Sequence, residues 1–433
     1  MQQKALRIAW LGPAPGEGAG VPGVNADLLQ GLARLGHRIE CFLPSAGHPL
    51  PANLVEEKNL EFIWGTSGWR WDRWYSRTKI TAFASGMLSR TVASLRLRRT
   101  IARRHRSQPY DLVYQFSSIE TPALPYRLRR AVPLVIHPET HSAGELRSLL
   151  AERRLSLRCQ PWYIFAAVVA LMSLRSLIQR VSIRHAHLLV CISSVFRDHL
   201  VRDYGFPQEA TVVIPNPVRI DRFAPTTRQI GNPPTVLVLG RVATRKGIED
   251  VVAVARALLT RGANVRLDVV GGPSLWSDYS KLLDDLPPEN ATYAGAVSAS
   301  EVPARLLECD VLLQASKYEP FALTVAEALA AGALVVATSE VGAIEDVDRS
   351  VVAEVQPGDV EAMVAGISTL LSRLEANPAE MRSTARAEAQ RLFAPDVVCQ
   401  QISVALAHMM EGRTPSAPTS VDRHEPAIPL QPR

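Results

Sequence analysis

Short apolar runs alternate with amphipathic segments along most of the chain. The apolar runs are rich in Val, Leu and Ile, which is typical of buried strands in a parallel sheet. Strands are predicted at 6–11, 38–43, 60–64, 111–116, 133–137, 187–191, 235–240, 265–270, 291–297, 310–314 and 333–337. Elsewhere apolar residues recur every three or four positions, which predicts helices at 24–35, 77–106, 248–259, 320–331, 362–374, 379–393 and 395–410. This alternation predicts an α/β protein with parallel sheets.

The chain of 433 residues is too long for one ordinary core, because single cores stop growing beyond roughly 250–300 residues. The segment 211–223 contains Pro215 and Pro217 and crosses between the two expected domains, which we assign to residues 1–214 and 215–394. Residues 411–433 are rich in Pro, Ser and charged side chains, so we expect a disordered tail there.

The segment 316–337 predicts a loop, a helix that starts near Pro320, and a buried strand. It places Glu319 at the start of the helix and Glu327 about two turns further along. The amides of Phe321, Ala322 and Leu323 would be free at that start, and such amides attract a phosphate. Carboxylates repel phosphates but accept hydrogen bonds from hydroxyl groups, so a nucleotide sugar suits this pattern. The alternative is that Glu319 caps the helix and Glu327 is solvated.

The same segment resembles a known family signature. The spacing Glu319-x7-Glu327, followed by Val341-Gly-Ala-Ile-Glu345, is similar to the signature of the retaining family-4 glycosyltransferases. The resemblance implies the GT-B fold, in which two Rossmann-like domains face each other across a cleft. The second domain then holds the donor, the first holds the acceptor, and helix 395–410 returns to the first domain.

A second stretch resembles the same family. Gly240-Arg241 ends a predicted strand, and Lys246-Gly247 follows in the next turn, similar to the family's Gly-Arg-Leu-x-x-x-Lys-Gly. The resemblance assigns Arg241 and Lys246 to the donor diphosphate, Glu327 to ribose hydroxyls, and Glu319 to hydroxyls of the transferred sugar.

The donor phosphate is also expected to meet backbone amides. The amides of Phe321, Ala322 and Leu323 would assist Arg241 and Lys246. Ala322 stands where the family usually has glycine, and we expect little loss because its N–H is retained. The resemblance implies a retaining, same-face displacement in which the leaving phosphate takes the acceptor proton. It requires no metal and no cofactor other than the nucleotide-sugar donor itself.

The first half offers a glycine loop and two histidines. Gly18-x-Gly20-x-x-Gly23 matches the dinucleotide fingerprint, but Pro22 lies inside the match and several residues separate it from the strand. We therefore favour a loop that approaches a phosphate through its amides, similar to the family's first-domain glycine loop. His137 and His141 follow a strand, and either could match the family's histidine beside the donor sugar. His137 is the better placed, although structural hydrogen bonding fits as well.

Charge is distributed unevenly. The net charge is +6, but residues 1–215 hold 28 Lys and Arg against 15 Asp and Glu, whereas residues 216–433 hold 20 against 27. The first half is therefore expected to face an acidic surface or partner. Five scattered cysteines without a Cys-x-x-Cys pair favour a reducing compartment, and no signal peptide is visible, so a cytoplasmic location is expected.

Two segments of the first half leave alternatives open. The helix at 77–106 carries many arginines between apolar residues, and a surface helix packed on the sheet is slightly favoured over a contact with anionic lipid. Residues 162–174 are apolar or small but shorter than the roughly twenty residues of a membrane span, so a buried core helix is favoured over an interfacial one. The presence of both segments in the first half favours the membrane hypothesis, in which the protein binds to the surface of a membrane as a peripheral protein.

Three classes of function remain. The favoured one is a retaining glycosyltransferase that moves a sugar from a nucleotide-diphosphate sugar to a glycan, lipid-linked or small-molecule acceptor. A nucleotide-sugar epimerase of the same fold would turn over donor without acceptor. A non-catalytic basic binding protein for nucleic acid or membrane would leave Glu319 and Glu327 without a role, and no nucleic-acid partner is expected.

Overall fold

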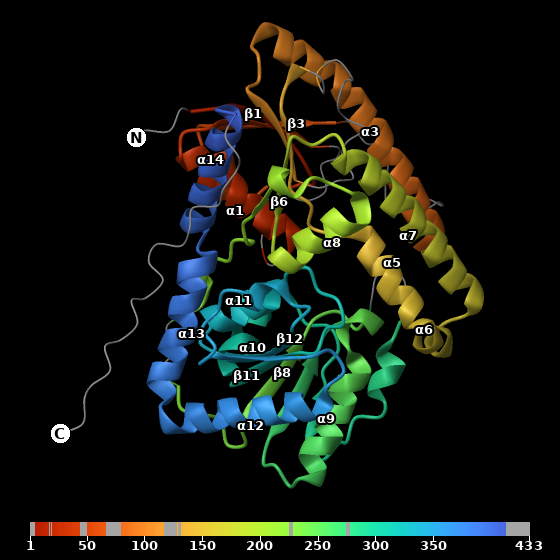
Figure 1. Cartoon of the computed structure of the whole chain (residues 1–433), viewed down its shortest axis with the longest axis vertical. Coiled ribbons are helices and arrows are strands. Elements are labelled where there is room, and N and C mark those ends of the chain that lie inside the picture. Colours follow the sequence, from red (N-terminus) through yellow and green to blue (C-terminus); the bar gives the residue numbers. More distant parts are fainter. Residues whose placement is uncertain are drawn as a thin grey trace, which may run out of the picture.

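The computed structural model describes residues 5–16, 18, 20–43, 50–65, 79–116, 128, 131–224, 228–273 and 278–412. The expected tail at 411–433 therefore lies almost entirely outside the described residues. The described strands form two separate sheets, each covered by helices, and the two units are stacked along the long axis of the molecule (Figure 1).

The first sheet has seven parallel strands in the order β3-β2-β1-β4-β5-β6-β7. Its strands are β1 (Arg7–Leu11), β2 (Arg38–Leu43), β3 (Leu60–Trp64), β4 (Leu112–Gln115), β5 (Leu134–Ile136), β6 (Leu188–Cys191) and β7 (Thr211–Val213). The helices around it are α1 (Val21–Arg34), α2 (Ala52–Val55), α3 (Lys79–Ser107), α5 (Ser142–Ala151), α6 (Arg153–Cys159), α7 (Trp162–Ile183) and α8 (Ser194–Tyr204).

The second sheet has six parallel strands in the order β10-β9-β8-β11-β12-β13. Its strands are β8 (Thr235–Leu239), β9 (Arg266–Val270), β10 (Ala291–Tyr293), β11 (Val311–Gln314), β12 (Leu334–Thr338) and β13 (Val352–Val355). Its helices are α9 (Ile248–Thr260), α10 (Val302–Glu308), α11 (Leu323–Ala330), α12 (Val360–Ala376) and α13 (Pro378–Phe393). Two parallel α/β sheets confirm the predicted fold class.

The central strands are buried on both faces. Every residue of β11 and β12 is buried, because helices cover each side of the sheet and the strands expose no polar face. The strand predicted at 291–297 ends at Tyr293, and β13 was not predicted.

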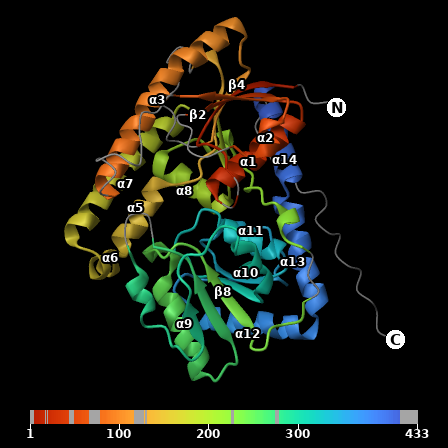
Figure 2. The same cartoon turned by 180° about the vertical axis from the view of Figure 1, so that it is seen from behind.

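Helix α14 (Pro395–Met410) returns from the second unit to the first. Its Cys399 packs so closely on α1 that a Cβ on Gly31 would lie 2.3 Å from the Cys399 Sγ. His37 Nε2 and Ser403 Oγ lie 2.8 Å apart in the same contact. Figure 2 shows α13 and α14 along one edge of the molecule, where they join its two halves.

The C-terminal half of α3 packs as the favoured interpretation predicts. Ala93, Leu97 and Ile101 are buried on the sheet, whereas Arg99 and Arg103 are exposed. The interpretation of residues 162–174 as a buried core helix is wrong. They belong to the 22-residue helix α7, and only 11% of its most apolar stretch is buried. The prediction failed because apolar composition alone does not show whether another part of the protein covers a helix.

Candidate active site

The loop between β11 and α11 forms the centre of the candidate site. The helix α11 begins at Leu323 rather than near Pro320, because Ala322 adopts a left-handed conformation with φ of 76° and ψ of 81°. Among the described residues, none accepts a hydrogen bond from the amides of Phe321, Ala322 or Leu323. These amides are therefore free at the start of α11, on the side of the second unit nearest the first (Figure 1).

Glu319 is paired with two cations. Its carboxylate accepts from Arg245 Nη1 at 2.9 Å and also forms an ion pair with the Lys246 ammonium group. Burial alone would raise the pKa of Glu319, but the charges of Lys246 and Arg245 outweigh it and lower the pKa to about 2. The side chain of Glu319 is therefore ionised, and both cations of the turn already bind its carboxylate in this structure.

The turn that carries these cations is pressed against the end of β11. Gly247 has φ of +66°, and a Cβ there would lie 2.0 Å from the carbonyl oxygen of Ala315. Only glycine allows this approach, which brings residues 244–247 beside the loop of Glu319. Burial lowers the pKa of Lys246, and the charge of Glu319 opposes that shift.

Arg241 and Gly240 lie at the end of β8, next to the same cations. A Cβ on Gly240 would lie 3.9 Å from Lys246 Nζ, and Arg241 is exposed. The charge of Arg241 contributes to the lowered pKa of Lys246. The structure thus brings Arg241, Lys246 and Glu319 into one region.

Glu327 lies further along α11 and is buried. Its Oε1 is 3.8 Å from Nη1 of Arg222, which belongs to the segment that crosses between the halves. Burial raises the pKa of Glu327 to about 7, and the charge of Arg222 opposes the rise. Near neutral pH this carboxyl therefore exchanges readily between its two protonation states.

His137 is fully buried at the end of β5. Its Nδ1 lies 2.8 Å from the Tyr114 hydroxyl, and its Nε2 lies 3.5 Å from Glu139 Oε1, beyond good hydrogen-bond geometry. Burial lowers the pKa of His137 to about 3, so the ring is neutral. Asn216 Nδ2 donates to the Glu139 carboxylate at 2.8 Å, which connects this cluster to the crossing segment.

His141 makes a contact between the two halves. Its Nδ1 lies 2.6 Å from the hydroxyl of Tyr318, and its Nε2 lies 3.1 Å from Asp203 Oδ2. Burial lowers the pKa of His141 to about 3, and Asp203 opposes the shift. His141 is therefore adjacent to the loop of Glu319 through Tyr318, whereas His137 is bonded within the first half.

The glycine loop approaches the second half. Gly18 and Gly20 have φ of +98° and +91°, and Gly20 is the N-cap of α1. A Cβ on Gly18 would lie 3.6 Å from the Cβ of Ala299. The loop thus faces residues of the second unit across the boundary.

Several residues of this region were not identified from the sequence. Arg245, Tyr318 and Arg222 contact predicted site residues, and only the position of Arg245 beside Lys246 signalled a role. Glu345 accepts hydrogen bonds from the amides of Ser194 and Val195 at 2.7 and 2.8 Å, at the start of α8. Ser193 Oγ donates to the carbonyl of Pro320 at 2.8 Å. Within the described part of the chain, no group of three or more His, Cys, Asp and Glu could hold a metal ion.

Comparison with known proteins identifies similar families. The model for Glycosyltransferase Family 4 matches residues 19–222, and the model for Glycosyl transferases group 1 matches residues 221–389. Together the two models extend over both halves and over the candidate site.

Individual relatives match to different extents. The mannosylfructose-phosphate synthase of Agrobacterium fabrum is 28% identical over 173 residues, which are 36% of this chain and only 38% of that protein. The MMP alpha-(1->4)-mannosyltransferase of Mycolicibacterium hassiacum is 26% identical over 400 residues, covering 87% of this chain and 91% of the relative. The structure of Anabaena Alr3699/HepE in complex with UDP has a TM-score of 0.61 at 19% identity, covering 93% of this chain and 100% of that one, which shows a shared fold.

Proposed function

Because this chain belongs to the GT-B glycosyltransferases of the group 1 and family 4 type, we propose that it transfers a sugar from a nucleotide-diphosphate sugar to an acceptor. One observation carries the proposal. Two cations, a carboxylate and three free amides converge where α11 begins. Cations and amides suit a diphosphate, and the carboxylate suits sugar hydroxyls.

The donor would replace a contact that the protein makes with itself. Glu319 is held by Lys246 and Arg245, so a diphosphate that takes Lys246 would release part of the carboxylate. The carboxylate could then accept hydrogen bonds from the transferred sugar. Arg241, exposed beside Lys246, would bind the same diphosphate, and the amides of residues 321–323 would complete its coordination. The complex of Alr3699/HepE with UDP supports a nucleotide donor.

Glu327 would hold the ribose. A hydroxyl that donates to this carboxylate favours its ionised form, and the pKa of Glu327 lies near 7 in the free protein because the side chain is buried. Donor binding would therefore release a proton near neutral pH. We assign His137, His141, Gly18 and Gly20 to the side of the donor that faces the first domain. Nδ1 of each histidine lies within hydrogen-bond distance of a tyrosine hydroxyl, so Nε2 is the nitrogen left for the donor in this assignment.

The chemistry follows from where charge develops. As the glycosidic bond breaks, negative charge grows on the diphosphate, and pre-positioned cations and amides stabilise it more strongly than they stabilise the bound substrate. The acceptor hydroxyl attacks from the same face, so configuration is retained, and its proton passes to the leaving phosphate. The scheme uses side-chain cations and amides and invokes no metal.

We propose a polyanionic or lipid-linked glycan as the acceptor and a cytoplasmic, membrane-peripheral location. The excess of cations in residues 1–215 supports an acidic partner. All five cysteines are free, which suits a reducing compartment.

A thermal-shift screen of nucleoside diphosphates and their sugars tests the donor site. Ligand that binds the native state raises its melting temperature by mass action, so one donor class should stand out. Lys246→Ala should abolish that shift, whereas Lys281→Ala, an exposed lysine of the same domain, should keep it. A shift that survives in Lys246→Ala contradicts the proposal. Release of nucleoside diphosphate only when acceptor is added then separates a transferase from an epimerase.

A further inference from the structure

Helix α7 exposes an apolar face along its whole length. Trp162 is 73% exposed, Tyr163 56%, Leu174 49%, Leu177 59% and Val181 51%. Their spacing of three, four or multiples of these places them on one side of the helix, together with exposed alanines at 166, 167 and 170. At 1.5 Å per residue, the face from Trp162 to Val181 extends about 28 Å. An exposed apolar face of that length marks an interaction surface.

Few residues of α7 are buried, and some of those few are polar. Its buried residues are Met172, Gln179, Ser182 and Ile183, two of which are polar. Gln179 accepts hydrogen bonds from the Ser142 amide and the Tyr204 hydroxyl, both at 2.8 Å. These hydrogen bonds anchor the C-terminal part of α7 to the first domain, whereas its exposed apolar face is left for a partner.

Helix α7 is also the one helix among the described residues that is long and apolar enough to cross a membrane. Its anchored C-terminal half opposes a spanning orientation. Gln179 and Ile183 are buried in the first domain, and α7 packs along α5. A helix whose C-terminal half is held by its own domain can lie in the plane of a bilayer surface, with only one face in contact with lipid.

The surroundings of this face are strongly basic. Residues 153–197 contain seven arginines and no Asp or Glu. Exposed arginines occupy both ends of the face, at 153, 154 and 158 on α6 and at 180 and 184 on and after α7. Within the described residues, none of these five forms an ion pair with a carboxylate. Leu157, 46% exposed, extends the apolar face onto α6. Unpaired arginines that flank apolar and aromatic side chains are complementary to an anionic lipid surface.

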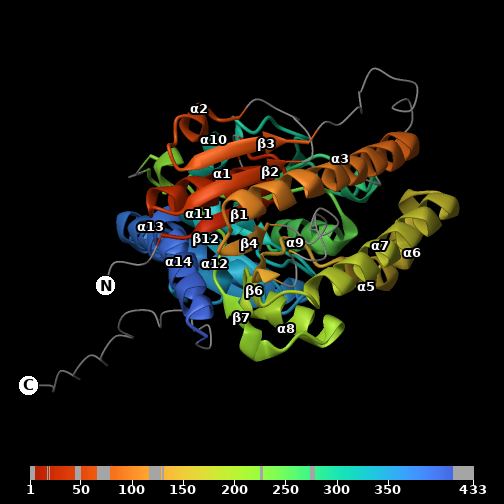
Figure 3. The ribbon, with the colours of Figure 1, turned by 90° about the horizontal axis from the view of Figure 1, so that it is seen from above.

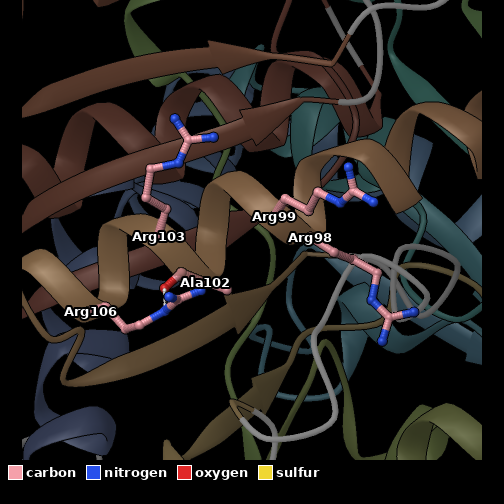
Figure 4. A pocket seen from close by; sticks show the side chains of 5 residues that line it. All are labelled: Arg98, Arg99, Ala102, Arg103 and Arg106. Atoms are coloured by element: carbon pink, nitrogen blue, oxygen red, sulfur yellow. Dashed lines mark hydrogen bonds between the residues drawn. The ribbon is translucent and has the colours of Figure 1, made fainter.

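Helix α3 adds a second basic feature. Arg98, Arg99, Arg103 and Arg106 line a shallow groove together with Ala102, and their guanidinium groups extend in different directions from the helix (Figure 4). Residues 79–110 contain no Asp or Glu. Helices α3 and α7 run along the same edge of the molecule in views from the front, the back and above (Figures 1, 2 and 3).

We propose that the apolar face of α7, flanked by the arginines of α6 and α7, inserts in the plane of an anionic bilayer surface. Trp162 and Tyr163 lie at the headgroup level, where amphipathic aromatic rings are favoured. The groove of α3 supplies additional charge at the same edge. The inference rests on the membrane-peripheral location proposed above and assigns it to a surface, which is separate from the residues that we assign to the donor.

Vesicle flotation with the full chain tests the inference. We expect binding to vesicles that contain 30% phosphatidylglycerol in phosphatidylcholine, and at least tenfold weaker binding to pure phosphatidylcholine. Each cation near an anionic surface contributes about fivefold, so Arg154→Ala with Arg158→Ala should weaken binding roughly 25-fold. Leu174→Glu with Leu177→Glu should weaken it at least tenfold. Val55→Glu, at an exposed apolar position of α2, should leave binding unchanged.

Other outcomes overturn the inference. Equal binding to both vesicles, or binding that survives Leu174→Glu with Leu177→Glu, removes the role of this face. Protein that resists extraction with alkaline carbonate would be spanning rather than in plane. Dimers that Leu177→Glu dissociates, without vesicle binding, would identify a second copy of the chain as the partner. The α7 variants should keep the nucleotide-induced thermal shift, and Lys246→Ala should keep vesicle binding, so the two proposals can fail separately.

Discussion

Replacing Glu319 by glutamine tests how the candidate site is charged before any donor binds. The substitution removes the negative charge but keeps the size of the side chain, so Arg245 and Lys246 are left side by side and half-buried without their shared partner. An uncompensated buried charge is costly, whereas a carboxylate near a diphosphate repels it. The Glu319→Gln variant should therefore be less stable alone and bind nucleoside diphosphate more tightly.

The magnitude follows from the pKa of Glu319. Its decrease from 4.5 to about 2 corresponds to about 3 kcal/mol of stabilisation. Burial lowers the pKa of Lys246, which opposes part of that gain, so we expect a net loss of about 2 kcal/mol. For a domain of this size the melting temperature should fall by roughly 4–8 °C. Because a lowered carboxyl pKa stabilises the fold above the unfolded value, the difference from wild type should shrink as pH falls from 4.5 towards 2.

The effect on binding has the opposite sign. A carboxylate and a phosphate charge about 7 Å apart, at an effective dielectric constant of about 20, repel by about 2 kcal/mol. Removing this repulsion should tighten nucleoside diphosphate binding roughly five- to thirtyfold, as measured by titration calorimetry. Sugar transfer should nevertheless fall by about 100-fold or more, because the sugar hydroxyls lose their acceptor.

A matched control uses a carboxylate of the same domain that is exposed. Glu361 pairs with Arg261 at the surface, so Glu361→Gln should change stability by less than about 0.5 kcal/mol and leave nucleotide binding unchanged. If Glu319→Gln melts at the wild-type temperature and binds nucleoside diphosphate more weakly, then Glu319 does not compete with phosphate for these cations. The proposed exchange of partners would then be refuted.

Two further predictions concern α11. Ala322 holds a left-handed conformation that costs an L-residue about 1–2 kcal/mol. Ala322→Gly should therefore raise the urea midpoint by an amount equivalent to about 0.5–1 kcal/mol. The control Ala331→Gly, at a residue with right-handed backbone, should lower the urea midpoint. Because the pKa of Glu327 is raised, its contribution to stability is complete below pH 4.5 and is lost as pH rises to 7. Glu327→Gln should therefore be roughly 2–3 kcal/mol more stable than wild type at pH 8, equally stable near pH 4.5, and weaker in nucleotide binding. A stability difference that stays constant across this pH range, measured by chemical denaturation, would contradict the assignment.

The alternation of apolar runs and helical periodicity predicted the strands of both sheets except the edge strands β7 and β13, because strands buried on two faces have little freedom in composition. β12 is an example, since the predicted run 333–337 overlaps Leu334–Thr338 and every residue of the strand is buried.

The remaining features depend on contacts between distant parts of the chain. The periodicity of α7 could not show that Gln179 would face the protein and Leu177 the outside. The tight turn at Gly247 brings Arg245 to Glu319 only because the turn packs on Ala315, a contact that the motif alone does not specify. The expectation of little loss from Ala322 in place of glycine considered only its N–H and overlooked the backbone conformation that glycine adopts without strain.

Three consecutive residues serve different neighbours. Tyr318 bonds to His141, Glu319 to the cations of its own domain, and Pro320 to Ser193 through its carbonyl. A ligand that displaces Glu319 therefore also disturbs its neighbours Tyr318 and Pro320, each of which forms a hydrogen bond to the other half of the molecule. Binding of the donor and binding of a ligand to the first half are then linked thermodynamically, so each ligand changes the affinity for the other by the same factor. The tripeptide 318–320 would thus couple the two binding sites.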